Sequence, residues 1–426
     1  MIIHVVEPEE TLASIAESYG LTPDALQVYN QLPNPDNLVV GQTIIVMYIR
    51  RQYTVQPQDT LEQIAIKNGI TTIQLLQRNP QLAQGRDIYE GETLVIEYEE
   101  EPLGELEVNG YAYPYIDEYV LRSSLPYLTY LTIFGYGFDL EGNLTTIPDE
   151  PLIELARQYQ TASVMLISSV SPEGVFNSYL ASALMKDPQL QDTLLNNILA
   201  TMESKGYVGL DIDFEYIPPE DAQGYAAFIQ RAKTKLHEQG YFVHVDLAPK
   251  TSADQRGLLY EAHDYDLIGA EADQVLIMTY EWGYLYGPPM AVAPLNQVRR
   301  VLEYAVSAIP PEKIQMGIPN YGYDWTLPFQ RGRPARLLGN MEAVQLAADY
   351  QAQIEYDLVS ASPFFYYTAE DGAAHVVWFE DARSIQAKLN LLFELKLAGA
   401  GYWNVMRLFL QNWMMLGQMF YIRKLL

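Results

Sequence analysis

The fold is decided by the stretch Gly209-Leu210-Asp211-Ile212-Asp213-Phe214-Glu215-Tyr216. Acidic and apolar residues alternate along it, which is the period-two pattern of a β-strand. As a strand, it places three carboxylates on one face and apolar side chains on the other. Because closely spaced negative charges repel each other, the pattern favours a site in which at least one acid stays protonated at neutral pH.

Composition limits the partners of this 426-residue chain. It contains 26 Lys and Arg and 54 Asp and Glu, which gives a formal net charge of -28. A surface with this charge repels nucleic acid and anionic lipid. Without cysteine the chain has neither disulfides nor thiolate metal ligands. We therefore expect a neutral or weakly charged polymer as partner, with no nucleic acid, no membrane insertion and no obligate protein partner.

The first residues of the chain do not have the pattern of a signal peptide. Met1-Ile2-Ile3-His4 and the residues that follow lack the basic segment and apolar core of a signal peptide. No apolar run has the length of a membrane span. We expect a protein that reaches its place of action without a cleaved signal peptide.

A repeat occupies the first hundred residues. Six residues recur at matching positions, and Gly41-Gln42-Thr43 returns as Gly91-Glu92-Thr93. The matching residues are Thr11, Leu12, Ile15, Ala16, Gly20 and Asn30 in the first unit, and Thr60, Leu61, Ile64, Ala65, Gly69 and Asn79 in the second. Each unit reads as strand, helix, helix and closing strand.

This βααβ repeat resembles the lysin motif (LysM), a module that binds glycans containing N-acetylglucosamine. The resemblance implies two glycan-binding domains, residues 1–48 and 51–97, followed by an acidic linker at 98–103. The alternative is a pair of spacers without a ligand. We favour binding, because duplication of a short module more often serves multivalent attachment.

From residue 104 to 426, apolar strand patterns alternate with helical ones. The expected strands are 107–112, 128–135, 162–168, 208–215, 242–247, 274–280, 315–321 and 399–405. Such alternation predicts an α/β fold, a (β/α)8 TIM barrel, whose active site lies at the carboxyl ends of the strands. A small α+β insertion is expected at about 331–380, before the last helix and strand, with a hairpin around Glu370-Asp371-Gly372.

Three strand ends carry a second resemblance. Asp211, Asp213 and Glu215 on strand four, Met278-Thr279-Tyr280-Glu281 on strand six and Tyr402-Trp403 on strand eight are similar to glycoside hydrolase family 18. That family contains chitinases and N-acetylglucosaminidases. Its signature is Asp-x-x-Asp-x-Asp-x-Glu, and Val208 stands where the first Asp belongs. This departure puts in doubt the charge network that supports Asp211.

The resemblance implies substrate-assisted, retaining hydrolysis. Glu215 would be the general acid, Asp213 would orient the 2-acetamido group, and Asp211 would hold Asp213 and share a proton with it. Tyr280 would bind the acetamide oxygen, and Trp403 would form the apolar surface under the sugar ring. Glu281, Trp282 and Tyr321 are further expected substrate-binding residues.

A divalent-metal site is the alternative for the three acids, since carboxylates bind Mg²⁺ or Ca²⁺. We expect no metal and no cofactor, because only 5 His occur and none is near the acids in sequence. Tyr280 and Trp403 could instead be ordinary barrel core, although their placement at strand ends favours the site.

The layout is similar to the spore cortex-lytic N-acetylglucosaminidase branch of the family. Two LysM-like units precede the barrel, Pro218-Pro219 follows the acid, and Glu281 stands where chitinases usually have Asp. The strand-three phrase Ser-x-Gly-Gly of chitinases is replaced by Ser168-Ser169-Val170-Ser171. We expect a peptidoglycan hydrolase that acts on spore cortex or cell wall. The alternatives are a chitin or chito-oligosaccharide hydrolase and a binding protein whose barrel has lost activity.

Overall fold

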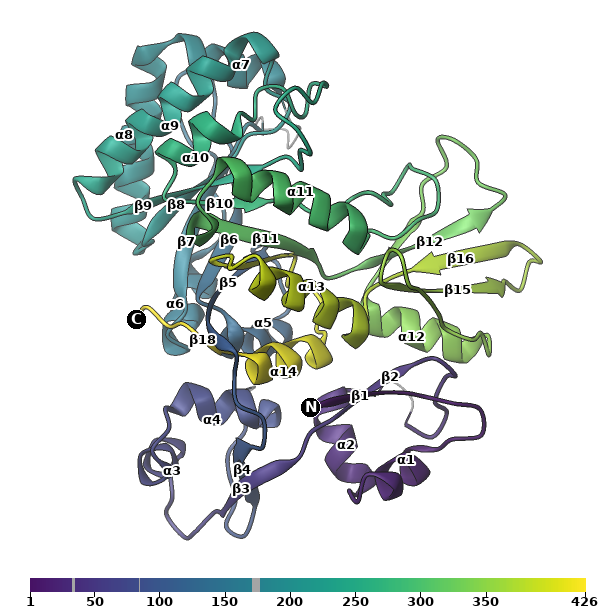
Figure 1. Ribbon diagram of the computed structural model, residues 1–426. Coiled ribbons are helices and arrows are strands. Elements are labelled where there is room, and N and C mark those ends of the chain that lie inside the picture. Colours follow the sequence, from purple (N-terminus) through teal and green to yellow (C-terminus); the bar gives the residue numbers. More distant parts are fainter. Residues whose placement is uncertain (33–34, 84, 171–176) are drawn as a thin grey trace.

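The protein is seen in a computed structural model that describes residues 1–32, 35–83, 85–170 and 177–426. In this part of the chain, eight parallel strands form the wall of a barrel, and pairing of the last with the first closes it (Figure 1). In order they are β5 (Gly104–Ala112), β6 (Tyr130–Tyr136), β7 (Ala162–Ser168), β8 (Gly209–Asp213), β9 (Phe242–Leu247), β10 (Gln274–Ile277), β11 (Ile314–Pro319) and β17 (Gly399–Trp403). The predicted TIM barrel is confirmed.

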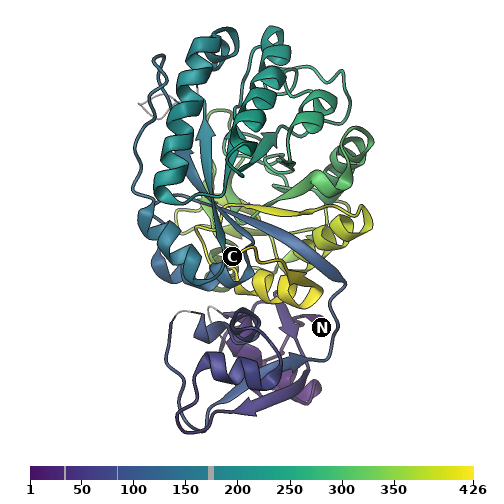
Figure 2. The same ribbon diagram turned by 90° about the vertical axis from the view of Figure 1, so that its left-hand side faces the viewer.

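Helices form the outer layer of the barrel (Figures 1 and 2). They are α5 (Glu118–Ser124), α6 (Glu150–Gln158), α7 (Ser178–Lys186), α8 (Pro188–Lys205), α9 (Ala222–His237), α10 (Tyr265–Glu271), α11 (Leu295–Ala308), α13 (Ala382–Glu394) and α14 (Leu410–Met419). Sequence patterns did not predict α14, which follows the last barrel strand and leads into a short strand, β18 (Phe420–Ile422), beside β5. The reason is that α14 is buried on nearly every side, so it lacks the one-sided apolar pattern of a surface helix.

The four strands that carry the predicted site residues, β8, β10, β11 and β17, all end earlier than expected. β8 ends at Asp213, where its neighbour β7 also ends, so Glu215 lies beyond the sheet. β10 likewise ends at Ile277, ahead of Tyr280. Both side chains therefore stand on the first residues of βα loops, which in this fold form the rim of the active site.

The insertion begins earlier than expected, directly after β11. It holds β12 (Gly322–Leu327), β13 (Arg336–Leu338), α12 (Asn340–Asp349), β14 (Glu355–Asp357), β15 (Ser362–Thr368) and β16 (Ala374–Trp378). The predicted start near residue 331 missed β12, which pairs antiparallel with β16 in the insertion's own sheet. The hairpin around Asp371 is confirmed, since β15 and β16 pair across it.

The two N-terminal repeats form βααβ modules, as predicted. The first contains β1 (Ile2–Val5), α1 (Leu12–Ser18), α2 (Pro23–Asn30) and β2 (Thr43–Val46), and the second contains β3 (Ile49–Thr54), α3 (Leu61–Asn68), α4 (Thr72–Arg78) and β4 (Thr93–Tyr98). The repeated Thr11 and Thr60 are helix N-caps, and each takes part in a capping box. In both modules the two strands pair antiparallel.

The repeated asparagines hold each module together. The Asn30 amide donates to the carbonyl oxygen of Ile45 at 2.8 Å and accepts from the Ile45 N–H at 2.7 Å. Asn79 makes the same pair of bonds to Val95, at 2.7 and 2.8 Å. Both asparagines are buried, so they join the second helix to the closing strand and do not face a ligand.

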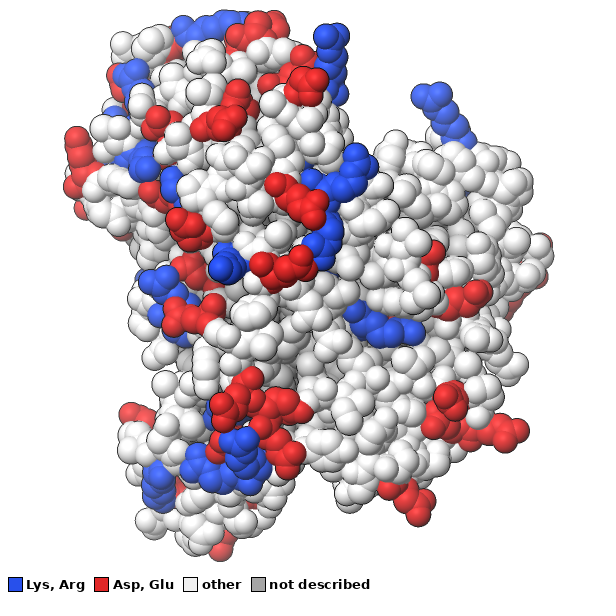
Figure 3. Space-filling view, in the orientation of Figure 1, with Lys and Arg blue, Asp and Glu red and all other residues white. Residues whose placement is uncertain are grey.

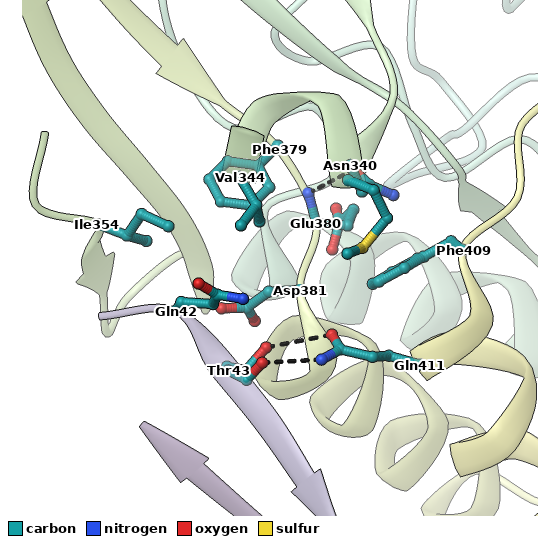
Figure 4. Close-up of a pocket in the computed structure, with 11 residues that line it drawn as sticks. Gln42, Thr43, Asn340, Val344, Ile354, Phe379, Glu380, Asp381, Phe409 and Gln411 are labelled. Carbon is teal, nitrogen blue, oxygen red and sulfur yellow. Dashed lines mark hydrogen bonds between the residues drawn. The ribbon is translucent and has the colours of Figure 1, made fainter. Parts of the chain in front are cut away.

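Both modules pack against the barrel below α14 (Figures 1 and 2). In the first, the Gln411 amide of α14 donates to the Thr43 carbonyl oxygen at 2.8 Å, and Figure 4 shows these side chains facing each other across the seam. In the second, Tyr127 of the barrel donates to the Gln77 carbonyl oxygen at 2.7 Å. The modules therefore form part of one packed body with the barrel.

No helix in the described ranges is both long enough and apolar enough to cross a bilayer.

Candidate active site

β8 fixes the direction of the acidic side chains. Its apolar positions point outward, where Phe214, just after the strand, stacks on Tyr225 and Phe228 of α9. Asp211 and Asp213 consequently point into the barrel, where their exposed fractions are 0% and 6%. The alternation read from the sequence therefore puts two carboxylates, rather than three, on the inner face of the strand, with Glu215 just above them.

A cleft of about 840 Å³ opens at the carboxyl ends of the strands. Among its lining residues are Asp213, Glu215, Tyr280, Glu281, Trp282 and Trp403, which the sequence had singled out. Asp211 lies beneath them, closed off from solvent. Three of the lining residues come from α11, and one of them, Arg300, is the single basic side chain among the described lining residues.

The acids of the cleft are electrostatically coupled. Burial raises the pKa of Asp211 to about 7 against the opposing hydrogen bond from Tyr111. Burial, reinforced by the charges of Glu215 and Asp211, raises the pKa of Asp213 well above its ordinary value. Glu215 also has its pKa raised to about 7, by burial and then by the charge of Glu281. The cluster therefore holds protons at neutral pH, as the sequence pattern indicated.

Two members of this cluster were missed by sequence reasoning. Tyr111, on β5, has its hydroxyl 2.8 Å from Asp211 Oδ2 and 2.8 Å from Asp246 Oδ1. Asp246, on β9, is 4% exposed and lines the cleft. The signal was present in the run His244-Val245-Asp246-Leu247, where an acid interrupts an apolar barrel strand.

Val208, which stands at the position of the signature's missing Asp, has an apolar environment. It lies at the opening of β8 against an apolar cluster that contains Tyr130, Val164 and Phe242. A carboxylate there would be placed among apolar side chains. Asp211 has a hydrogen-bond donor in Tyr111 of β5, although Val208 replaces the first Asp of the signature.

Tyr280 stands immediately beyond β10, and its ring is accommodated by a glycine. A Cβ atom on Gly317 of β11 would come within 2.8 Å of the Tyr280 ring, so any larger residue would displace it. Burial, followed by the charges of Asp246 and Asp213, raises the pKa of Tyr280 well above its ordinary value. Its hydroxyl therefore keeps its proton and can donate a hydrogen bond.

Trp403 forms an aromatic surface at the end of β17. Its ring packs edge-on against Tyr111, Tyr113 and Phe134, with centroids 5.4 to 6.0 Å apart. Only part of the indole is buried, and it lines the cleft. An apolar ring held by three aromatic neighbours is a suitable floor for a sugar.

Glu281 is held by two tyrosines, one from β12 and one just before it. Its Oε1 atom accepts from Tyr321 at 2.5 Å and from Tyr323 at 3.0 Å. Tyr321 is itself buried, so it supports Glu281 from behind the cleft wall. The backbone of the next residue, Trp282, is fixed by its main-chain N–H, which donates to the Val292 carbonyl oxygen at 3.0 Å.

Among the described residues, no group of three or more His, Cys, Asp or Glu side chains is arranged to hold a metal ion.

These features define a glycoside hydrolase: a TIM barrel whose strand ends present a carboxyl group with a raised pKa above a buried pair of aspartic acids, beside an aromatic floor. The chain belongs to the glycosyl hydrolases family 18, which it matches over residues 119–407, and its N-terminal repeats match the LysM domain over residues 4–46 and 53–97.

Similar proteins span the whole chain. It is 39% identical to the cortical fragment-lytic enzyme of Bacillus subtilis (strain 168), with 100% of this chain and 99% of that protein covered. It is 37% identical to the enzyme of the same description in Bacillus anthracis, over 99% of both. Among solved structures, the spore cortex-lytic enzyme SleL of Bacillus megaterium superposes with a TM-score of 0.85 at 37% identity, covering 100% of this chain and 99% of that one.

Proposed function

We propose that the protein is an N-acetylglucosaminidase that hydrolyses spore cortex peptidoglycan at the bond after N-acetylglucosamine. The observation that carries the proposal is the environment of Glu215, a largely buried carboxyl group at the cleft whose pKa is raised to about 7. A group with such a pKa can give a proton and take one back near neutral pH. The full-length similarity to cortical fragment-lytic enzymes supports the choice of substrate.

In the first step, Glu215 protonates the glycosidic oxygen as the bond from that oxygen to C1 breaks. The carbonyl oxygen of the 2-acetamido group attacks C1 from the other side and forms an oxazolinium ion. Asp213 accepts a hydrogen bond from the acetamide N–H and stabilises the positive charge on nitrogen. For this, Asp213 passes its own proton to Asp211, its neighbour on the same strand face.

Tyr280 donates a hydrogen bond to the acetamide oxygen, and Trp403 carries the ring of the sugar. In the second step, Glu215 removes a proton from water, and the water oxygen bonds to C1 on the face that the leaving group left. The bond from C1 to the acetamide oxygen breaks as this happens, and the proton on Asp211 returns to Asp213. The product keeps the anomeric configuration of the substrate. Glu281 and Trp282 contact the glycan along the cleft, with Tyr321 holding Glu281 in place.

We further propose that different parts of the chain bind the glycan and hydrolyse it. Residues 1–48 and 51–97 attach the protein to glycan strands rich in N-acetylglucosamine, residues 98–103 link them to the barrel, and residues 104–426 carry the chemistry. The matches to the LysM domain support the first part. The place of action is the spore cortex or the cell wall.

Mass spectrometry of the fragments released from purified spore cortex tests the proposal. The expected products carry N-acetylglucosamine at the reducing end. Release of N-acetylmuramic acid at the reducing end would overturn the bond assignment. Chitin oligomers serve as the second substrate, and faster turnover of these oligomers than of cortex fragments would favour a chitin hydrolase.

A further inference from the structure

Two buried acids from neighbouring strands share one phenol. The Tyr111 hydroxyl of β5 lies 2.8 Å from Asp211 on β8 and 2.8 Å from Asp246 on β9. The three residues are at most 4% exposed. Asp246 plays no part in the two steps described above, although it lines the same cleft.

The number of protons available limits how Tyr111 can bond to both acids. A phenol has a single proton, so its oxygen can donate to one carboxyl group only. The second carboxyl group, at the same distance, must then donate a proton of its own to the phenol oxygen. Otherwise two negatively polarised oxygen atoms would face each other in a buried space. At least one of Asp211 and Asp246 is therefore protonated.

The surroundings indicate which acid holds the proton. Burial, and then the charges of Asp211 and Asp213, raise the pKa of Asp246 well above its ordinary value. Burial also raises the pKa of Asp211, but only to about 7, because hydrogen bonds from Tyr111 and from the Ile212 N–H favour its charged form. The Tyr111 hydrogen bond lowers the pKa of Asp246 too, so the difference between the two acids comes from the Ile212 N–H at Asp211 and from the neighbouring charges at Asp246. The proton is therefore on Asp246, and Asp211 is the acceptor.

We propose that Asp246 is a positioning residue for hydrolysis: its carboxylic acid donates to the Tyr111 oxygen, and Tyr111 in turn commits its own proton to Asp211. The proposal rests on the proposed glycosidase function. In such a chain each hydrogen bond polarises the next, so Tyr111 becomes a stronger donor to Asp211. Asp211 is thereby kept anionic, ready to receive the proton that Asp213 gives up when it turns to the acetamide.

Other titratable groups face Asp246 from each packed element. They are Tyr111 on β5, Asp211 and Asp213 on β8, Glu215 beyond β8, Tyr225 on α9 and Tyr280 beyond β10. All of them are acids or phenols. An ionised Asp246 would therefore add to a negative cluster, whereas a protonated Asp246 supplies a donor without adding charge.

The direction of a pH shift separates these two states. If Asp246 is the protonated donor, Asp246→Ala weakens the Tyr111 bond to Asp211 and raises the pKa of Asp211. The acid limb of the kcat/KM profile on cortex fragments then moves to higher pH, by about half a unit or more. If Asp246 is ionised, its removal takes away a negative charge, and the limb moves to lower pH.

Asp246→Asn is the matched variant, because its amide N–H can donate to Tyr111 as the acid does. We expect it to bring the limb back toward the wild-type position. Val245→Ala, on the same strand but facing the helices, controls for loss of packing. If the acid limb of Asp246→Ala moves to lower pH or stays at the wild-type position, the proposal is overturned.

A double-mutant cycle tests whether the effect passes through Tyr111. In a Tyr111→Phe background, Asp246→Ala should shift the acid limb no further, because the hydrogen-bonded chain is already broken. An equal shift in both backgrounds contradicts the positioning role.

The protonation state can be measured without any turnover. In protein labelled with ¹³C at aspartate carboxyl carbons, the resonance absent from Asp246→Asn is that of Asp246. We expect the chemical shift of a carboxylic acid at pH 7, and that of a carboxylate would disprove the proposal. An inactive protein with a protonated Asp246 would instead count against the glycosidase function alone.

Discussion

Asn30 of the first module and Gln411 of α14 in the barrel are joined by a hydrogen bond of 2.9 Å from the Gln411 amide to Asn30 Oδ1. The same Asn30 oxygen accepts the Ile45 N–H that closes the module. One buried atom thus serves both the internal fold of the module and its attachment to the barrel. The seam between module and barrel is part of the folded core rather than a flexible joint.

This seam predicts that the barrel needs the modules for stability. Removal of residues 1–97 would uncover Gln411 and the hydroxyl of Tyr127, both buried, and take away the Thr43 and Gln77 carbonyl oxygens to which they donate. Once uncovered, these groups bond to water instead, so each lost hydrogen bond costs about 0.5–1.5 kcal/mol. We expect calorimetry to give a lower Tm for residues 98–426 than for the full chain. Equal Tm values would show that the seam contributes nothing.

Glu215→Gln should abolish hydrolysis while it preserves the fold. The amide keeps the size of the side chain but has no proton to give, so kcat should fall by several orders of magnitude. Glu118→Gln is the matched control, because it makes the same change in a surface ion pair with Arg122, away from the cleft. The measurement is release of muropeptides, with glycan binding and Tm followed in parallel. Retention of more than about a tenth of wild-type activity would exclude Glu215 as the acid.

Asp213 should lower the free energy of unfolding of the protein as the pH rises. Its pKa is raised in the fold, so below the ordinary pKa of about 4 both folded and unfolded states are protonated, and the stability contribution is fully present. As pH rises, the unfolded state ionises while the folded state keeps the proton, and stability is lost. Asp213→Asn removes this loss, so its Tm advantage over wild type should grow from pH 5 to pH 8.

Asp192→Asn, in an ion pair with Arg231 on the surface, controls for the loss of one acidic charge. Thermal unfolding of the three proteins across pH provides the comparison. A Tm difference for Asp213→Asn that stays constant, or shrinks with pH, would mean that the raised pKa is wrong.

The sequence predicted the barrel, the modules and the strand-four acids because each leaves a local pattern. Asp211, Ile212 and Asp213 alternate, and the repeats match residue by residue. Tyr111 and Asp246 could not be found in that way, since they meet Asp211 only after three separate strands are assembled. The repeated Asn30 and Asn79 were conspicuous in sequence for a reason that it could not reveal, namely a bond from helix to strand inside each module.

Hydrolysis should not require a metal ion. The proposed chemistry uses carboxyl groups and the substrate's own acetamide, and no described cluster is arranged for a cation. We expect turnover of cortex fragments to be unchanged after dialysis against EDTA. Activity that disappears with EDTA and returns with Mg²⁺ or Ca²⁺ would favour the metal site considered from the sequence.

Attachment to the wall should depend on the modules and tolerate salt. Two weak sites on one body raise the effective concentration of each for a polymeric glycan. The chain carries a net charge of -28, and on the face shown in Figure 3 acidic and basic side chains are intermingled, so attraction to an anionic wall does not explain binding. Salt screens only charge interactions at the surface. In a Glu215→Gln background, which leaves the wall intact, we expect the full chain to stay on purified peptidoglycan through moderate salt.

The truncated chain, residues 98–426, should be released in the same assay, provided that circular dichroism shows it to be folded at the assay temperature. The full and truncated chains that keep the native Glu215 should differ much less in their cleavage of short soluble glycans. A short substrate occupies the cleft and does not reach the modules. Equal retention of the two chains would leave the modules without a role in attachment. Release of the full chain by modest salt would make its binding electrostatic after all.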